Sequence, residues 1–175
     1  MRVAEFMPLV EQQVLSALSV HLRDCTSRIR SVWLQIHYHT TKVHYEVWLA
    51  RKINRIEIGL HFEGAHDFSY CWAELIAPYM PEIQARLGPQ VELEEWTASW
   101  TRVHQTRPYD PLSETLADEV AARLAEMITV LQPMVERERE NVPVELEQMR
   151  EPPRTMGGHR FSRRSERHPS RGAGS

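Results

Sequence analysis

Cysteine and glycine are scarce in this sequence. The two cysteines among its 175 residues, Cys25 and Cys71, match no metal-binding or redox spacing. A small secreted domain would carry more of them, so we expect reduced thiols and a cytoplasmic protein. Before residue 141 the glycines are Gly59, Gly64 and Gly88. That spacing excludes a glycine-rich loop of the kind that binds phosphates.

Long apolar runs are also missing. Glu5 and Glu11 interrupt the first apolar stretch, so we expect no export signal. No stretch approaches the roughly 18 consecutive apolar residues that a membrane-spanning helix needs. The sequence therefore predicts a soluble protein without a membrane partner.

Lysine is the scarcest charged residue, and charge is unevenly distributed along the chain. Lys42 and Lys52 are the only lysines. Residues 1–149 hold 14 Lys and Arg against 22 Asp and Glu, a balance of −8, whereas residues 150–175 hold seven against two, a balance of +5, which together give the net charge of −3. An acidic body with a basic tail is the expected arrangement.

Apolar residues recur every three or four positions in three segments, which predicts amphipathic helices. These segments run from about Ala4 to Arg23, from about Trp72 to Leu87, and from Pro111 to about Pro133. Two prolines break or kink the second helix, because proline removes a backbone donor. Asp110 is the expected N-cap of the third helix, which should end or kink near Pro133.

After the first helix the apolar period changes to two. Alternating runs at Val32–His39, Val43–Leu49 and Arg55–Glu63 are joined by short polar links, which predicts an antiparallel meander. Val91–Trp96 and Trp100–His104 are further expected strands. We therefore expect an α+β fold with an antiparallel sheet of four to five strands, in the order α-β-β-β-α-β-β-α.

Apolar periodicity stops near residue 140. We predict a single α+β domain over 1–140 and a disordered tail over 141–175, where too little is left to bury. The tail is expected to bind nucleic acid weakly and with strong salt dependence, through Arg160, Arg163, Arg164, Arg167 and Arg171. A tail without function, or one that lies on the acidic body, is the alternative.

Alternation also identifies the side of the sheet that faces away from the core. This side carries imidazole and carboxylate groups: His37, His39, His44, Glu46, His61 and Glu63. Residues two apart on one strand lie about 7 Å apart, which suits ligands of one Zn²⁺, Fe²⁺ or Mn²⁺ ion. Such a site with an open position could activate water for hydrolysis. The alternative is a solvated face with His–Glu pairs and no metal.

The register of the second hairpin decides which of these groups meet. We expect the turn at Ile53–Asn54, because asparagine tolerates the left-handed conformation of a tight hairpin. This turn places Glu46 opposite His61 and His44 opposite Glu63, with Cβ atoms about 5 Å apart.

Trp33 and Trp48 lie on the same predicted face. In one allowed register they form a direct cross-strand pair. Exposed aromatic rings can stack on nucleic-acid bases, but the face is acidic, and that argues against phosphate binding. We expect a helix or a protein partner to cover these rings.

Three short motifs give a resemblance to a known family. At Leu87-Gly88, Leu93-Glu94-Glu95-Trp96 and Arg102-Val103 the chain resembles an uncharacterised bacterial domain family found beside restriction-nuclease-like domains. The resemblance covers about residues 55–103, and the long preceding meander departs from it. It implies an accessory role near nucleic-acid processing, and no catalytic residues carry over.

The sequence as a whole predicts a non-enzymatic intracellular binding or accessory module that acts through protein or nucleic-acid partners. The alternative is a small metal-dependent hydrolase that uses the His/Glu set of the polar face. No nucleophile-elbow motif supports a serine hydrolase.

Overall fold

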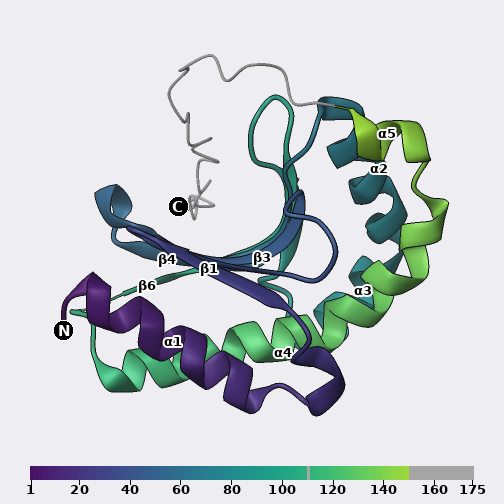
Figure 1. Cartoon of the computed structure of the whole chain (residues 1–175). Coiled ribbons are helices and arrows are strands. Elements are labelled where there is room, and N and C mark those ends of the chain that lie inside the picture. The colour runs from purple at the N-terminus through teal and green to yellow at the C-terminus, as the bar shows by residue number, and fades with distance from the viewer. Residues whose placement is uncertain (110, 150–175) are drawn as a thin grey trace, which may run out of the picture.

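A computed structural model describes residues 1–109 and 111–149 (Figure 1). The helices are α1 (Val3–Ala17), α2 (His66–Ile76), α3 (Met80–Leu87), α4 (Glu114–Glu138) and α5 (Val144–Gln148). The strands are β1 (Thr26–Arg30), β2 (Trp33–His37), β3 (Val43–Ala50), β4 (Arg55–Phe62), β5 (Glu92–Glu95) and β6 (Thr101–Pro108).

The fold is α+β, as the periodicity predicts, with one six-stranded antiparallel sheet in the order β1-β2-β3-β4-β6-β5. The sheet has one strand more than expected. The additional strand is β1, at Thr26–Arg30. The first helix ends earlier than predicted, at Ala17. As an edge strand, β1 buries Ser27 and Ile29 only in part, and Ile29 is its one apolar residue, so it lacks a strong apolar signal.

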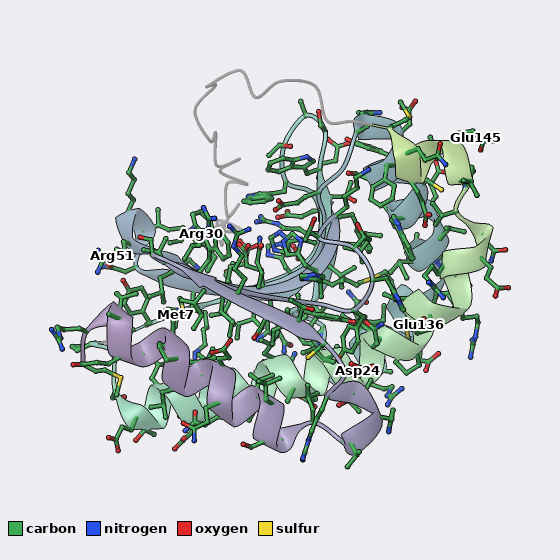
Figure 2. All side chains as sticks on the ribbon, viewed as in Figure 1. Met7, Asp24, Arg30, Arg51, Glu136 and Glu145 are labelled. Carbon is green, nitrogen blue, oxygen red and sulfur yellow. The ribbon has the colours of Figure 1, made fainter. Side chains whose placement is uncertain are left out.

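One side of the sheet is covered by helices. Figure 1 shows α1 and α4 side by side beneath it. Met7 of α1 lies between that helix and the sheet, whereas Arg30 lies on the other side of the sheet (Figure 2). Leu34, Ile58 and Leu60 have no exposed surface and face this layer. The hydrophobic core therefore sits between the sheet and these two helices.

Helix α4 begins at Glu114, with Ser113 as its N-cap, and the Ser113 hydroxyl accepts a hydrogen bond from the Leu116 backbone N–H at 3.1 Å. The predicted N-cap, Asp110, lies outside the described residues. We expected the helix to end or kink near Pro133. It continues through that proline to Glu138, so the expected end is wrong. Burial of one whole side of α4 against the sheet and α1 outweighs the one backbone bond that proline removes.

Proline does divide the second helical segment, as predicted. Helix α2 ends at Ile76, a 3₁₀ turn covers Ala77–Tyr79, and α3 begins at Met80. Gly88 caps α3 with a φ of 96°, a conformation that favours glycine. These two helices pack at one end of the sheet (Figure 1).

The hairpin of β2 and β3 has the register that pairs Trp33 with Trp48. The expected register of the second hairpin is wrong. The turn takes up four residues, because Arg51–Ile53 forms a 3₁₀ turn that ends in left-handed Asn54, with a φ of 50°. Ala50 therefore pairs with Arg55, and His44 lies opposite His61 rather than opposite Glu63.

The described chain continues past residue 140. Val142 is buried against the core, and α5 follows it. The arginines that we assigned to a nucleic-acid-binding tail, at positions 160, 163, 164, 167 and 171, lie outside the described residues. Within the described residues no helix is both long and apolar enough to cross a membrane.

Candidate metal centre

The polar side of the sheet is organised in rows that cross the strands. The register places one row at His44, His61, Arg102 and Glu94, and the next at Gln35, Glu46, Gly59 and His104. Glu57 lies in a third row, opposite Trp48, and Glu63 follows the end of β4. We call the polar members of this set the polar cluster: Gln35, His44, Glu46, Glu57, His61, Glu63, Glu94, Arg102 and His104.

Most of the polar cluster is buried, which alternation alone does not reveal. His61 has no exposed surface, and the exposed fractions of His44 and Glu57 are 1% each. Glu46, Arg102 and His104 are also buried. Burying charge is costly unless it is paired, so this side of the sheet is not the solvated face that we considered as an alternative.

His44 is fixed by backbone and side-chain contacts on both ring nitrogens. Its Nδ1 lies 2.8 Å from the Thr41 carbonyl oxygen, and its Nε2 lies 3.0 Å from the Gln35 amide nitrogen. A carbonyl accepts and an amide N–H donates, so Nδ1 carries the proton and Nε2 is the acceptor. The same Gln35 amide donates to Glu46 at 2.8 Å. Nε2 of His44 therefore has the lone pair that a metal ligand needs, and a metal would displace the Gln35 hydrogen bond from it.

His61 lies between two carboxylates. Its Nε2 is 3.0 Å from Glu57 Oε1, and its Nδ1 is 3.3 Å from Glu63 Oε1. The contact with Glu57 is close but poorly aligned, and neither of its two atoms has a hydrogen-bond partner among the described residues. Burial lowers the pKa of His61, but the contacts with Glu57 and Glu63 outweigh burial and raise that pKa to about 10.

A second group of charges supports Glu57 from the neighbouring strands. Arg102 donates to Glu57 at 2.6 Å and to Glu94 at 2.6 Å, and His104 Nε2 lies 2.7 Å from Glu94. Burial raises the pKa of Glu57, but His61 and Arg102 outweigh burial and hold it below its ordinary value. The hydrogen bond from His104 is the largest of the effects that lower the pKa of Glu94 to about 2. Burial opposes it, and the hydrogen bond from Arg102 lowers the pKa further.

Tryptophan rings cover the cluster. The Trp96 ring packs edge-on against His61 at a centroid distance of 5.0 Å, and Arg102 lies over the same ring at 5.2 Å. Trp48 and Trp100 flank Trp96 at 6.1 Å and 5.7 Å. We predicted a helix or a partner over Trp33 and Trp48. Trp48 instead contacts Trp96, which follows β5.

The structure brings some of the predicted metal ligands together and leaves others apart. His44, His61 and Glu63 come together: one donor atom from each lies within 4.8 Å of the others. Glu46 is adjacent, with Oε2 3.7 Å from His44 Nε2. His37 stands at the end of β2, where burial first and the nearby His44 second lower its pKa. His39 is not in the cluster; it pairs with Glu136 of α4 at 2.7 Å and is 42% exposed.

The wrong placement of His39 has a simple cause. Strand β2 ends at His37, so the two-residue alternation that we extended to His39 no longer applies there. The predicted ligand set also left out Glu57, Glu94, Arg102 and His104. Alternation along β6 could have grouped the last two, but nothing in the chain order indicates that β6 pairs with β4.

The spacing of the donor atoms approaches that of a tetrahedral metal site, and one distance matches it. Glu63 Oε1 lies 3.8 Å from His44 Nε2 and 3.3 Å from His61 Nδ1. Ligands of a tetrahedral Zn²⁺ with bonds of about 2.0 Å lie about 3.3 Å apart. The two imidazole rings are stacked with an interplanar angle of 23°. Because ring lone pairs lie in the ring plane, coordination by both requires one ring to rotate about its Cβ–Cγ bond.

The charge of the polar cluster also favours a cation. Four carboxylates, Glu46, Glu57, Glu63 and Glu94, outnumber the one guanidinium of the cluster, that of Arg102, and an imidazole must be neutral to bind a metal. Glu63 and Glu94 keep some contact with solvent, whereas the other two are buried. A bound divalent ion would therefore offset part of this negative charge.

Comparison of the chain with protein-family models, with curated proteins and with solved structures finds no match. The resemblance to the bacterial domain family therefore remains a prediction.

Proposed function

We propose that this protein is a binding module that holds one divalent transition-metal ion on the buried polar side of its sheet. His44, His61 and Glu63 would be the ligands. The observation that carries the proposal is the convergence of three donor atoms within 4.8 Å in a buried, negatively charged cluster. Mixed imidazole and carboxylate donors favour Zn²⁺, Fe²⁺ or Mn²⁺ over Ca²⁺ or Mg²⁺.

The contacts made by the second ring nitrogen of each histidine support the metal-binding proposal. Histidines that bind metals usually donate their second ring N–H to a carbonyl or a carboxylate. His44 has the Thr41 carbonyl in that position, and His61 has Glu57, which Arg102 holds in turn. These partners set the tautomers, and rotation of one ring about its Cβ–Cγ bond would bring both opposite nitrogens to the shared position.

Burial favours a structural or sensing role for the ion over catalysis. A hydrolytic centre must admit a substrate beside its metal-bound water. Here His61 is fully buried under the Trp96 ring, and the side chain of Glu63 is 12% exposed. We place this binding function in the cytoplasm, where Cys25 and Cys71 stay reduced thiols.

A metal-dependent hydrolase is the second candidate. The observation in its favour is the number of ligands: three protein groups leave a fourth position for water, as in catalytic zinc sites. Glu46 is near enough to act on such a water or to become the fourth ligand. Hydrolysis of p-nitrophenyl acetate and p-nitrophenyl phosphate by the metal-loaded protein, lost in the variant Glu46→Gln, would favour this candidate.

Metal binding itself is tested by stoichiometry. Protein freed of metal with a chelator is dialysed against Zn²⁺ or Mn²⁺, and the bound ion is counted by mass spectrometry. We expect one ion per chain, and less than half of that in His44→Gln and in Glu63→Gln. With Co²⁺ in place of Zn²⁺, visible absorption bands should report nitrogen and oxygen ligands.

His39→Gln is the matched control, because His39 lies outside the polar cluster and is half exposed. This variant should keep full stoichiometry. Absence of stoichiometric binding by the parent protein, or retention of the ion in both ligand variants while they stay folded, would refute the proposal.

A further inference from the structure

A cavity of about 230 Å³ lies on the helix-covered side of the sheet, apart from the polar cluster. It is bordered by the link between β2 and β3, by α2, by the end of α4 and by α5. Val43 lines this cavity, whereas its neighbour His44 points to the opposite side of β3 and joins the polar cluster. The cavity is therefore a separate candidate site.

The walls of the cavity are largely apolar. Val43 and Phe68 border it, with Trp72 and Val135 from α2 and α4. The Trp72 ring stacks on Phe62 with a centroid distance of 5.5 Å and an interplanar angle of 6°, which fixes its orientation. Such walls suit the apolar body of a small organic molecule.

Hydrogen-bond donors outnumber free acceptors around this space. Lys42 Nζ donates to the backbone carbonyls of Glu147 at 2.6 Å and Met149 at 2.8 Å, which uses two of its three N–H groups. Arg139 also lines the cavity, and its ion pair with Glu136 is long, at 3.7 Å. The Trp72 indole N–H is buried and has no hydrogen-bond partner among the described residues.

The acceptors near the cavity are mostly occupied. Glu136 accepts from His39 and from Gln132, and the Gln132 carbonyl accepts from Tyr45. Glu147 brings one carboxylate, and it is exposed to solvent. A ligand that supplies acceptors and negative charge would meet the unused donors, whereas a cationic ligand would not.

We propose that this cavity binds a small organic carboxylate with an apolar or aromatic body. The body would lie against Phe68 and Val135, and the carboxylate would face Lys42 and Arg139. This site does not depend on the metal proposal, because the two sites share no side chain.

The test compares two ligands of nearly the same shape, phenylacetate and phenylacetamide. Titration calorimetry on the full chain, with chelator present, should show phenylacetate binding at least about tenfold more tightly, since the charged ligand alone can pair with Lys42 and Arg139. In backbone amide NMR spectra, phenylacetate should shift residues 39–43 and 135–139. Equal binding of the two ligands, or shifts confined to other regions, would overturn the proposal.

Variants assign the binding to the cavity. Lys42→Met should weaken phenylacetate binding by about tenfold or more, and Lys52→Met, at the only other lysine and in the exposed turn after β3, should not. Val135→Phe fills the space without removing a polar group and should abolish binding. Thermal melts establish that each variant is folded, and unchanged binding in folded Val135→Phe would refute the assignment.

Discussion

The two sides of the sheet are buried by different physical means. On the helix-covered side, Leu34, Ile58 and Leu60 pack against α1 and α4, and burial of apolar surface stabilises the fold. On the other side, His61 and Arg102 are buried against the Trp96 ring, and the buried Glu57 carboxylate lies beside both. Strand β4 takes part in both sides, with alternate residues in each environment.

This difference predicts two kinds of response to mutation. Loss of an apolar side chain leaves a cavity, whose cost depends on how far the surroundings can relax. Loss of one partner in a buried ion pair leaves an uncompensated charge, which is costly whatever the packing. The polar side should therefore be the more sensitive to single substitutions and the more tolerant of paired ones.

The largest effect is expected for Arg102→Met. The change leaves Glu57 buried without its guanidinium partner and should lower the free energy of unfolding by about 3–5 kcal/mol. Denaturant titration followed by tryptophan fluorescence measures it. Arg107→Met is the control, because Arg107 makes only an exposed pair with Glu119 and should cost less than about 1 kcal/mol.

The paired change Arg102→Met with Glu57→Leu sharpens the same point. Removal of both charges should restore much of the lost stability, since no buried carboxylate remains without its arginine. A double variant no more stable than Arg102→Met alone would mean that packing, and not charge, sets the cost.

The apolar side is tested by Leu60→Ala. Leu60 is fully buried on β4, and the substitution should lower the free energy of unfolding by about 3 kcal/mol through the cavity it leaves. The same denaturant titration applies. A loss larger than that of Arg102→Met would reverse the proposed order of the two sides.

Gly59→Ala should have an intermediate effect. Gly59 lies opposite His104, and an added methyl carbon would sit 2.6 Å from the His104 Cβ and 2.8 Å from the Val103 carbonyl oxygen. The strands must move apart, at a cost of about 1–3 kcal/mol. A Gly59→Ala variant with an unchanged free energy of unfolding would show that the polar side of the sheet has more space than the structure gives it.

The smallest expected effect is the contribution of Glu94 to acid stability. Its pKa is lowered from 4.5 to about 2, so its stabilising contribution is complete above about pH 4.5 and is lost as the pH falls toward 2. Glu94→Gln should flatten this part of the curve of stability against pH. The side chain is 41% exposed, so screening by solvent keeps the effect modest.

Glu92→Gln on the same strand is the control for this measurement, because Glu92 is exposed and makes no ion pair among the described residues. Chemical denaturation at a series of pH values between 2 and 6 gives both curves. Parallel curves for Glu94→Gln and the parent protein would contradict the assigned pKa.

The apolar side of the molecule could be predicted from the sequence, and the polar side only in part. Periods of 3.6 and 2 locate the long helices and the meander because each element buries one face. They do not show where β6 pairs, since that depends on contacts distant in the sequence. Arg102 and His104 therefore stayed unassigned, although both belong to the polar cluster.

The register error is instructive for the same reason. Asn54 does adopt the left-handed conformation that predicted a turn, but the 3₁₀ turn before it adds two residues to the loop. A shift of two keeps every side chain on its predicted face while changing its partner. The set of residues on the polar side was thus largely correct, and the pairs within it were not.

The link between β2 and β3 contacts both proposed sites. The Thr41 carbonyl accepts from His44, while Thr40 and Lys42 on either side border the cavity. A carboxylate that draws Lys42 toward itself would move the carbonyl that orients the imidazole. By thermodynamic linkage, a metal ion bound at the polar cluster would change the affinity of the cavity for the carboxylate. The factor would equal the one by which the carboxylate changes the affinity of the cluster for the metal.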